Sequence, residues 1–281
     1  MLRRGKRLPG KTPEQVLAMR RAGLVVARTL EAVGQALAPG RTTAELDAVA
    51  EDLIRGDGAV PSFKGYQGFP ASLCVSVNEE VVHGIPGERR LEAGDLVSVD
   101  CGAILDGWHG DAARSWVVPG APADTAIDAL VEDTRLAMWH GIGALRPGGR
   151  VFDIGDAIQD LLEEREEERG LTYGLVEDYG GHGIGREMHM DPWIPMFSSR
   201  GTSDRVSEGL TVAVEPMVTL GSARTRTLSD DWTVVTTDAS RAAHWENTVA
   251  VTADGLWVLT ELDGGAAGLA EAGARYAPLG D

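Results

Sequence analysis

One order of elements occurs twice along this 281-residue chain, and the repetition constrains the fold more than any other feature of the sequence. In each copy, two helical patterns precede an alternating apolar segment that ends on an acid. GDLVSVD ends at Asp100 and GLTVAVE ends at Glu215, so both the opening glycines and the closing acids are 115 residues apart. Such similarity predicts two alike halves around a pseudo-twofold axis, with a site between them. Chance similarity of apolar patterns is the alternative.

The helical patterns have recognisable starts and ends. The segments TPEQ (12–15) and TTAE (42–45) can each form a capping box, and apolar residues follow each of them at three- or four-residue steps. Similar patterns occupy 127–144 and 154–169, and the second of these closes on the charged run EEREEER, which suits a solvated helix end. Together with the alternating segments, these helices predict an α+β fold.

A hairpin should bring two carboxylates together. Two alternating segments, LVSVDCGAI and HGDAARSWVV, flank the dipeptide Asp106-Gly107, which favours a two-residue turn. In that register Asp100 faces Ala113, so Asp100 and Asp111 lie diagonally on one face of the sheet. Two acids on an apolar face repel each other and lose solvation unless a cation lies between them. The hairpin therefore indicates a divalent metal site, and two exposed acids on a wet sheet face are the alternative.

Three further segments carry groups of the same kind. Glu215 lies in VAVEPM, and Glu246 lies in the alternating segment HWENTVAVT. GGHGIGREMHMDP carries His182 and His189 among glycines that let backbone approach a ligand closely. A lone histidine is usually structural, but two of them alongside four strand-borne acids favour a functional cluster.

The net charge of −17 is unevenly distributed. Residues 1–28 carry eight basic side chains and one acid, so the acidity lies in the rest of the chain. Overall acidity argues against a general nucleic-acid binder. The basic start could contact an anionic partner such as RNA, although a flexible, solubilising start is the simpler interpretation. With two cysteines, no secretory signal and no apolar run of about 18 residues, we expect a cytoplasmic protein that does not span a membrane.

Taken in order, these motifs resemble those of the type I methionine aminopeptidases, which are metallohydrolases with the pita-bread (creatinase/aminopeptidase) fold. The resemblance extends from about residue 11 to 260, and SVDCG, HGDAARS, GGHGIG, VAVEPM and WENTV match the five metal-binding motifs of that family. It implies two pseudo-twofold related halves with a curved antiparallel sheet covered by helices, in a catalytic domain at 12–261. The implied metal ligands are Asp100, Asp111, His182, Glu215 and Glu246.

The resemblance also implies the cofactors and the reaction. Two divalent ions (Mn²⁺, Fe²⁺ or Co²⁺, with Zn²⁺ as an alternative) would activate the water that attacks the first peptide bond of a nascent protein or peptide. N-terminal methionine would be removed, preferentially when the second residue is small. Glu215 would move the proton, His189 would stabilise the oxyanion and His83, in NEEVVHGIP, would hydrogen-bond the substrate. The implied substrate-binding residues are Tyr66, Phe69, Cys74, His83, Met188, His189 and Trp232.

Some positions depart from the family or lie outside the resemblance. The family usually has a histidine where this chain has Asn247, directly after the last metal-binding acid, so metal affinity or metal choice could shift. Residues 1–11 form a basic N-terminal extension that could contact the ribosome transiently. The Ala/Gly-rich residues 262–281 are expected to be a flexible tail. We expect a monomer.

Three other functions stay open at this stage. GKRLPGKT (5–12) matches the phosphate-loop pattern of nucleotide hydrolases, but no strand fits in front of it. An X-Pro peptidase would share the fold, although HGIP and EPM favour a methionine aminopeptidase. A non-catalytic relative would be expected to lack metal ligands, and all five are in place here.

Overall fold

The computed structural model describes residues 5–280, and its strands pair in antiparallel sheets. The helices are α1 (Pro13–Ala36), α2 (Thr43–Gly56), α3 (Thr125–Gly143), α4 (Asp153–Arg169) and α5 (Ala266–Glu271), with a short 3-10 turn at Tyr66–Gly68. One sheet contains β1 (Val60–Pro61), β2 (Leu73–Val77), β4 (Leu96–Leu105) and β5 (Trp108–Val117). A five-stranded sheet contains β7 (Gly181–Gly183), β8 (Met190–Ile194), β9 (Thr211–Val214), β14 (Asn247–Val251) and β15 (Leu256–Val258). Two three-stranded sheets are formed by β3 (Glu80–Val82), β11 (Thr225–Thr227) and β12 (Val234–Thr236), and by β6 (Gly174–Leu175), β10 (Met217–Thr219) and β13 (Ala242–His244).

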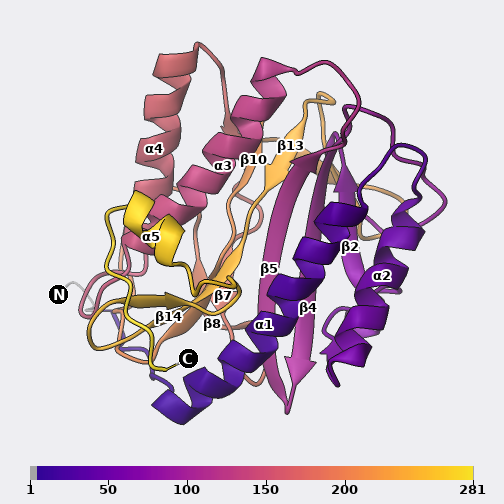
Figure 1. The fold of residues 1–281 in the computed structure, drawn as a ribbon. Helices are drawn as coiled ribbons and strands as arrows, with labels where there is room; N and C mark the ends of the chain where they lie inside the picture. Colours follow the sequence, from indigo (N-terminus) through magenta and orange to yellow (C-terminus); the bar gives the residue numbers. More distant parts are fainter. Residues whose placement is uncertain (1–4, 281) are drawn as a thin grey trace.

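The two predicted halves are present, and each has its own apolar core. Figure 1 shows α1 and α2 over the strands of one half, and α3 and α4 over those of the other. In the first half, apolar side chains of α1 and α2 pack on β2 and β4. In the second half, apolar side chains of α3 and α4 pack on β9 and β14. The predicted α+β architecture with two alike halves is confirmed.

The helix starts follow the predicted capping chemistry. The Thr12 amide donates to Gln15 Oε1 at 3.0 Å, and the Gln15 amide donates back to Thr12 Oγ1 at 3.4 Å. Thr42 and Glu45 form the same box at the start of α2, with distances of 2.8 and 3.2 Å. Each box satisfies amides that have no partner within the helix. The two helices therefore begin where the sequence predicts.

The β4–β5 hairpin has the predicted register. Asp106 and Gly107 form the turn with φ values of +51° and +74°, as a tight two-residue hairpin requires. Asp100 pairs with Ala113, and Gly102 pairs with Asp111. Asp100 and Asp111 therefore lie on one face of the sheet. Cys101 points to the other face, where it is fully buried in the core under α1.

The described part of residues 262–281, for which the sequence predicts a flexible tail, packs against the rest of the fold. Leu269 of α5 is fully buried, and Gly268 lets the helix approach Trp139 so closely that a Cβ would lie 2.2 Å from its ring. The Arg20 guanidinium of α1 donates to four backbone carbonyls between residues 258 and 262. One buried side chain and these backbone contacts hold the tail, although its composition resembles that of a loose terminus.

Residues 5–11, for which a flexible start is the simpler interpretation of the sequence, also bond to the rest of the fold. Leu8 is buried in the core of the second half, and its amide donates to the Arg205 carbonyl at 3.3 Å. The Lys11 amide donates to the Gly209 carbonyl at 2.7 Å. Because these amides are already bonded to the protein, they cannot cradle a phosphate as a phosphate loop does. Arg3 and Arg4 lie outside the described residues.

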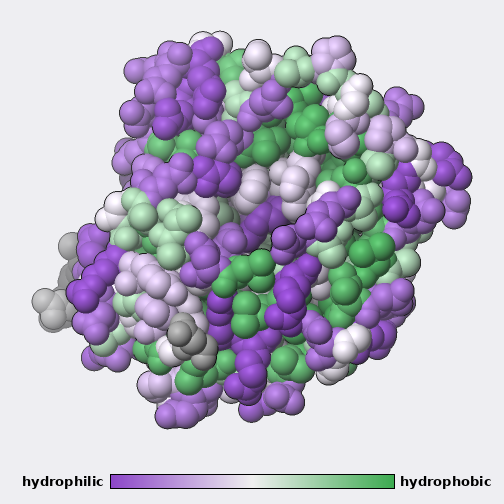
Figure 2. Space-filling model, in the orientation of Figure 1, coloured by the Kyte–Doolittle hydropathy of each residue, from purple (hydrophilic) through white to green (hydrophobic). Residues whose placement is uncertain are grey.

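The acidic end of α4 lies on the surface. Figure 2 shows hydrophilic residues gathered over α4, in agreement with the predicted solvated helix end. Within residues 5–280, none of the helices has the length and the apolar character that crossing a bilayer requires.

Candidate active site

One cavity of about 330 Å³ is lined by side chains from both halves of the fold. The hairpin of the first half contributes two acids, and the strands of the second half contribute a histidine and two further acids. All of the predicted site residues line this cavity, namely Tyr66, Phe69, Cys74, His83, Asp100, Asp111, His182, Met188, His189, Glu215, Trp232 and Glu246. Residues that are as much as 180 positions apart in the sequence are therefore brought together as the motifs predicted.

Backbone contacts between the halves position Asp111 and Glu246. The Asp111 amide donates to Thr248 Oγ1 at 3.1 Å, and the Thr248 hydroxyl donates to the Asp111 carbonyl at 2.8 Å. The Glu246 amide donates to the carbonyl of Ala113, the residue opposite Asp100, at 3.0 Å. These bonds fix Glu246, the last of the predicted metal ligands along the chain, beside the hairpin acids.

His182 and Glu215 face each other from neighbouring strands. His182 of β7 pairs with Ala213 of β9, and Glu215 follows the end of β9. His182 Nδ1 lies 3.0 Å from the Gly183 carbonyl, which can only accept, so Nδ1 carries the hydrogen. His182 Nε2 lies 3.5 Å from Glu215 Oε1, and its lone pair is therefore free to bind an ion.

The four carboxyl groups lie together, with Asp111 and Glu246 buried and Asp100 and Glu215 partly exposed. Burial raises the pKa of Asp100 to about 7. Burial and repulsion from neighbouring acids raise the pKa values of Asp111, Glu215 and Glu246 well above their ordinary range. Among the described residues that line the cavity, none is a lysine or an arginine. The cavity thus offers these acids no cationic side chain, and the charge of Arg114, outside the cavity, offsets only part of the repulsion at Glu246.

The donor set fits divalent metal ions. Asp100 Oδ1 and Asp111 Oδ1 are buried and have no hydrogen-bond partner among the described residues, and such orphaned acceptors are rare unless an ion or water satisfies them. Ligand atoms of Asp111, His182 and Glu246 all lie within 4.8 Å of one another. Carboxylate oxygens with one imidazole suit Mn²⁺, Fe²⁺ or Co²⁺. Burial lowers the pKa of His182 to about 4, so its imidazole is neutral, as a ligand must be.

The other end of the cavity is apolar. Phe69 and Trp232 pack edge to face with ring centroids 5.1 Å apart, and Met188 and Cys74 are buried beside them. Burial and the charge of Asp100 raise the pKa of the Cys74 thiol well above its ordinary value. Cys74 is therefore an uncharged, apolar lining group, and a nucleophilic thiolate is disfavoured there.

Two histidines lie between the acidic and the apolar ends. His189 packs against His182 with ring centroids 4.4 Å apart, and its Nδ1 lies 3.0 Å from the Tyr66 hydroxyl. His83 follows β3 with a φ of +61° and contacts the rings of Tyr179 and Trp232 edge to face. Burial lowers the pKa of both imidazoles, that of His83 to about 4, so both are neutral at pH 7.

Comparison with known proteins shows the family. The model of metallopeptidase family M24 matches residues 17–253. The chain belongs to this family. Methionine aminopeptidase 1 of Mycobacterium tuberculosis is 51% identical over 259 residues, which cover 92% of this chain and 97% of the relative. The resemblance to type I methionine aminopeptidases is thereby confirmed.

Solved structures show the same M24 fold. The crystal structure of methionine aminopeptidase from Rickettsia prowazekii matches with a TM-score of 0.85 at 38% identity, over 90% of this chain and 99% of that chain. Prolidase from Pyrococcus furiosus matches with a TM-score of 0.68 at 23% identity, over 89% of this chain and 65% of that chain, which is a likeness of fold alone. The expected pita-bread fold is confirmed.

The M24 centre of this chain includes residues that the motifs did not reveal. Tyr179 and Met217 line the cavity, and His244 Nε2 lies 3.9 Å from Glu215 Oε2. A signal for His244 is present in HWENT, because His244 and Glu246 are two residues apart and can share a face in an extended segment. No comparable local signal marks Tyr179, which lies in a loop.

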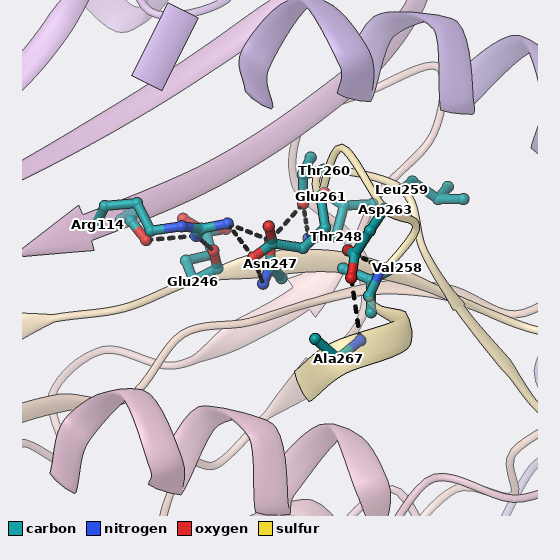
Figure 3. A network of polar contacts seen from close by, with 12 residues as sticks. Arg114, Glu246, Asn247, Thr248, Val258, Leu259, Thr260, Glu261, Asp263 and Ala267 are labelled. Atoms are coloured by element: carbon teal, nitrogen blue, oxygen red, sulfur yellow. Dashed lines mark hydrogen bonds and ion pairs between the residues drawn. The ribbon is translucent and has the colours of Figure 1, made fainter. Parts of the chain in front are cut away.

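Asn247, the residue that departs from the family, does not line the cavity. Its side chain lies in a polar network (Figure 3). Its Oδ1 accepts from Arg114 Nη2 at 2.9 Å and from the Thr260 hydroxyl at 2.7 Å, and its Nδ2 donates to Glu261 Oε1 at 3.1 Å. Arg114 Nη1 also donates to the Glu246 carbonyl at 2.6 Å. Asn247 is therefore linked to Glu246, a predicted ligand, through Arg114, which bonds to the Glu246 backbone.

Proposed function

We propose that this chain removes the N-terminal methionine from nascent proteins and peptides, preferentially when the second residue is small. One observation carries the proposal: a single cavity holds a cluster of carboxylates at one end and a thioether-compatible aromatic pocket at the other. The first end suits peptide hydrolysis, and the second suits a methionine side chain. The 51% identity to a methionine aminopeptidase supports the same activity.

Five residues would hold two divalent ions. Asp111 and Glu246 would take part in holding both ions, Asp100 would help to hold one of them, and His182 with Glu215 would help to hold the other. Such a pair supplies Lewis acidity, which lowers the pKa of water and polarises the scissile carbonyl. The buried orphan oxygens of Asp100 and Asp111 support this assignment.

The remaining chemistry belongs to side chains of the cavity. Glu215 would accept the proton of the attacking water at a carboxylate oxygen and pass it to the leaving amine. Tyr66 can donate to His189 Nδ1, which leaves the hydrogen on Nε2, and this N–H would stabilise the oxyanion. His83 would hydrogen-bond the substrate near the scissile amide.

The methionine side chain would lie in the pocket of Phe69, Cys74, Met188 and Trp232. Sulfur atoms make favourable contacts with the edges of aromatic rings, and the Phe69–Trp232 pair offers such edges. The free amine of the substrate would lie at the acidic end, which explains why only the first residue is removed.

Two tripeptides test the proposal. Protein loaded with Mn²⁺ or Co²⁺ is incubated with Met-Ala-Ser and with Ala-Pro-Ser, and the released amino acid is measured by mass spectrometry. We expect methionine from the first and nothing from the second. Release of alanine from Ala-Pro-Ser would identify an X-Pro peptidase, and release from neither would indicate a non-catalytic relative.

The cellular setting follows from the same proposal. The substrates would be nascent N-termini in the cytoplasm, and the enzyme would act as a monomer. Ribosome contact through the basic N-terminus stays a prediction. Arg20 and Arg28 are less available for it than the sequence suggested, because they bond to backbone carbonyls and to Asp57.

A further inference from the structure

The Glu215 carboxylate lies between two imidazoles. Its Oε1 is 3.5 Å from His182 Nε2, and its Oε2 is 3.9 Å from His244 Nε2. The first imidazole belongs to the predicted ligand set, whereas the second belongs to no motif of that set. Each oxygen of one carboxylate thus faces a different ring nitrogen.

His244 is held rigidly in this position. It ends β13, where it pairs with Met217 of β10, two residues after Glu215. The His244 amide donates to Ser115 Oγ at 2.9 Å, and the Ser115 hydroxyl donates back to the His244 carbonyl at 2.9 Å. Ser115 lies on β5, which also carries Asp111. The backbone of His244 is therefore tied to a strand of the metal site.

The Nε2 atom of His244 is buried without a hydrogen bond to any residue that the structure describes. The residue as a whole is 1% exposed. Buried polar atoms nearly always have a partner, so an unpaired one that points at carboxylates indicates a missing ligand.

The ligand atoms of Glu215, His244 and Glu246 lie within 4.8 Å of one another. Bonds of about 2.1 Å to a common ion allow two ligand atoms to be up to about 4.2 Å apart. The observed separation of 3.9 Å between Glu215 and His244 lies within that limit. The distance suits two ligands of one ion better than a direct hydrogen bond, which requires about 3 Å.

We propose that His244 is a second imidazole ligand of the metal centre and binds one of its ions through Nε2, together with Glu215 and Glu246. This inference rests on the proposed metallopeptidase function. It raises the number of imidazoles at the metal centre from one to two. Since imidazole suits Fe²⁺, Co²⁺ and Zn²⁺ better than Mn²⁺, the second imidazole should strengthen the binding of Co²⁺ more than that of Mn²⁺.

The test counts the imidazoles that bind Co²⁺ in each protein molecule. Metal-free protein receives two equivalents of Co²⁺, and X-ray absorption gives the number of imidazoles bound to Co²⁺ per protein, while calorimetry gives Kd. We expect two imidazoles per protein in the wild type, one in His244→Gln, and a Kd that is raised at least tenfold for one of the two equivalents in the variant. His140→Gln, on α3 away from the cavity, is the matched control and should keep both values.

The outcomes separate this inference from the proposed function. One imidazole per protein in the wild type would overturn the inference, even if Met-Ala-Ser is cleaved. A raised Kd with an unchanged imidazole count in His244→Gln would also overturn it, because His244 would then only support Glu215. Two imidazoles without release of methionine would uphold the ligand and refute the peptidase. The wild-type count decides the matter even where the variant fails to fold.

Discussion

Ala113 and Glu246 exchange two backbone hydrogen bonds across the boundary between the halves, with N–O distances of 3.2 and 3.0 Å. Ala113 also pairs with Asp100 in the β4–β5 hairpin. This single contact therefore places the backbone of Glu246 beside both hairpin acids. The two halves meet through the residues that carry the metal centre, and a change at the centre should affect how they hold together.

Replacing Asp111 with asparagine should abolish activity and should stabilise the metal-free protein against unfolding. Asp111→Asn removes a carboxylate that is proposed to help hold both ions, so we expect turnover of Met-Ala-Ser to fall by more than about a hundredfold and metal binding by calorimetry to be lost. The metal-free variant should unfold at a higher temperature than the wild type, because one buried, repelled acid is gone. An active variant would refute the role of Asp111 in holding the ions.

The metal-free protein should lose stability as pH rises from 6.5 to 8. An acid whose pKa is raised in the folded state stabilises the fold while it is protonated, and this contribution is lost as pH rises through the folded-state value. For Asp100, stability is lost between about pH 4 and about pH 7. The raised pKa values of the other three acids extend this loss of stability to higher pH. The buried histidines have lowered pKa values, so their contribution to stability rises with pH. This rise ends at about pH 6.5, where the histidines of the unfolded state lose their protons, and it does not offset the loss above that pH.

Urea unfolding with a chelator, compared with unfolding in Mn²⁺, measures this effect. The metal-bound protein should show the opposite slope, since ions bind deprotonated carboxylates. A metal-free stability that stays level or rises between pH 6.5 and 8 would contradict the raised pKa values of the four acids.

Arg114 should support both stability and metal affinity. It is 9% exposed and bonds to Glu246, Asn247 and Glu261. Arg114→Met should lower the free energy of unfolding by about 2–4 kcal/mol and weaken metal binding by roughly tenfold. Arg114→Lys should have a stability and a metal affinity between those of the wild type and Arg114→Met, because lysine keeps the charge but lacks the planar guanidinium group. As a control, Arg28→Met breaks only an exposed pair with Asp57 and should change stability by less than about 1 kcal/mol.

Trp232 should determine binding of the methionine side chain more than it determines folding. Its ring is only partly buried, and it contacts Phe69 and His83 in the cavity. Trp232→Ala should raise KM for Met-Ala-Ser by roughly tenfold, with a smaller effect on kcat, and Trp232→Phe should recover most of the loss. A fall in kcat at constant KM would show that the ring acts on the reacting bond instead.

Local sequence chemistry accounts for much of the fold and of the candidate site. The Asp106-Gly107 turn fixes the hairpin register and thereby places Asp100 and Asp111 on one face. The capping boxes likewise specify where α1 and α2 begin. In each case, residues within a few positions of one another determine the outcome.

The parts that sequence reasoning missed depend on distant contacts. The tail is held because Gly268 meets Trp139 and because Arg20 reaches the carbonyls near residue 260. His244 joins the centre because β13 pairs with β10 and places it opposite Met217. Nothing within a few residues of either feature reveals its partner.

The bonds between Ala113 and Glu246 also determine the order in which the parts of the site assemble during synthesis. The hairpin acids and the helices that cover them are synthesised well before Glu246, and the first half has a core of its own that can form early. Asp100 and Asp111 therefore lack Glu246 and β14 as neighbours until the ribosome has synthesised the second half. A peptidase built in this way is inert during its own translation and becomes competent only after the strand that carries Glu246 has emerged and docked.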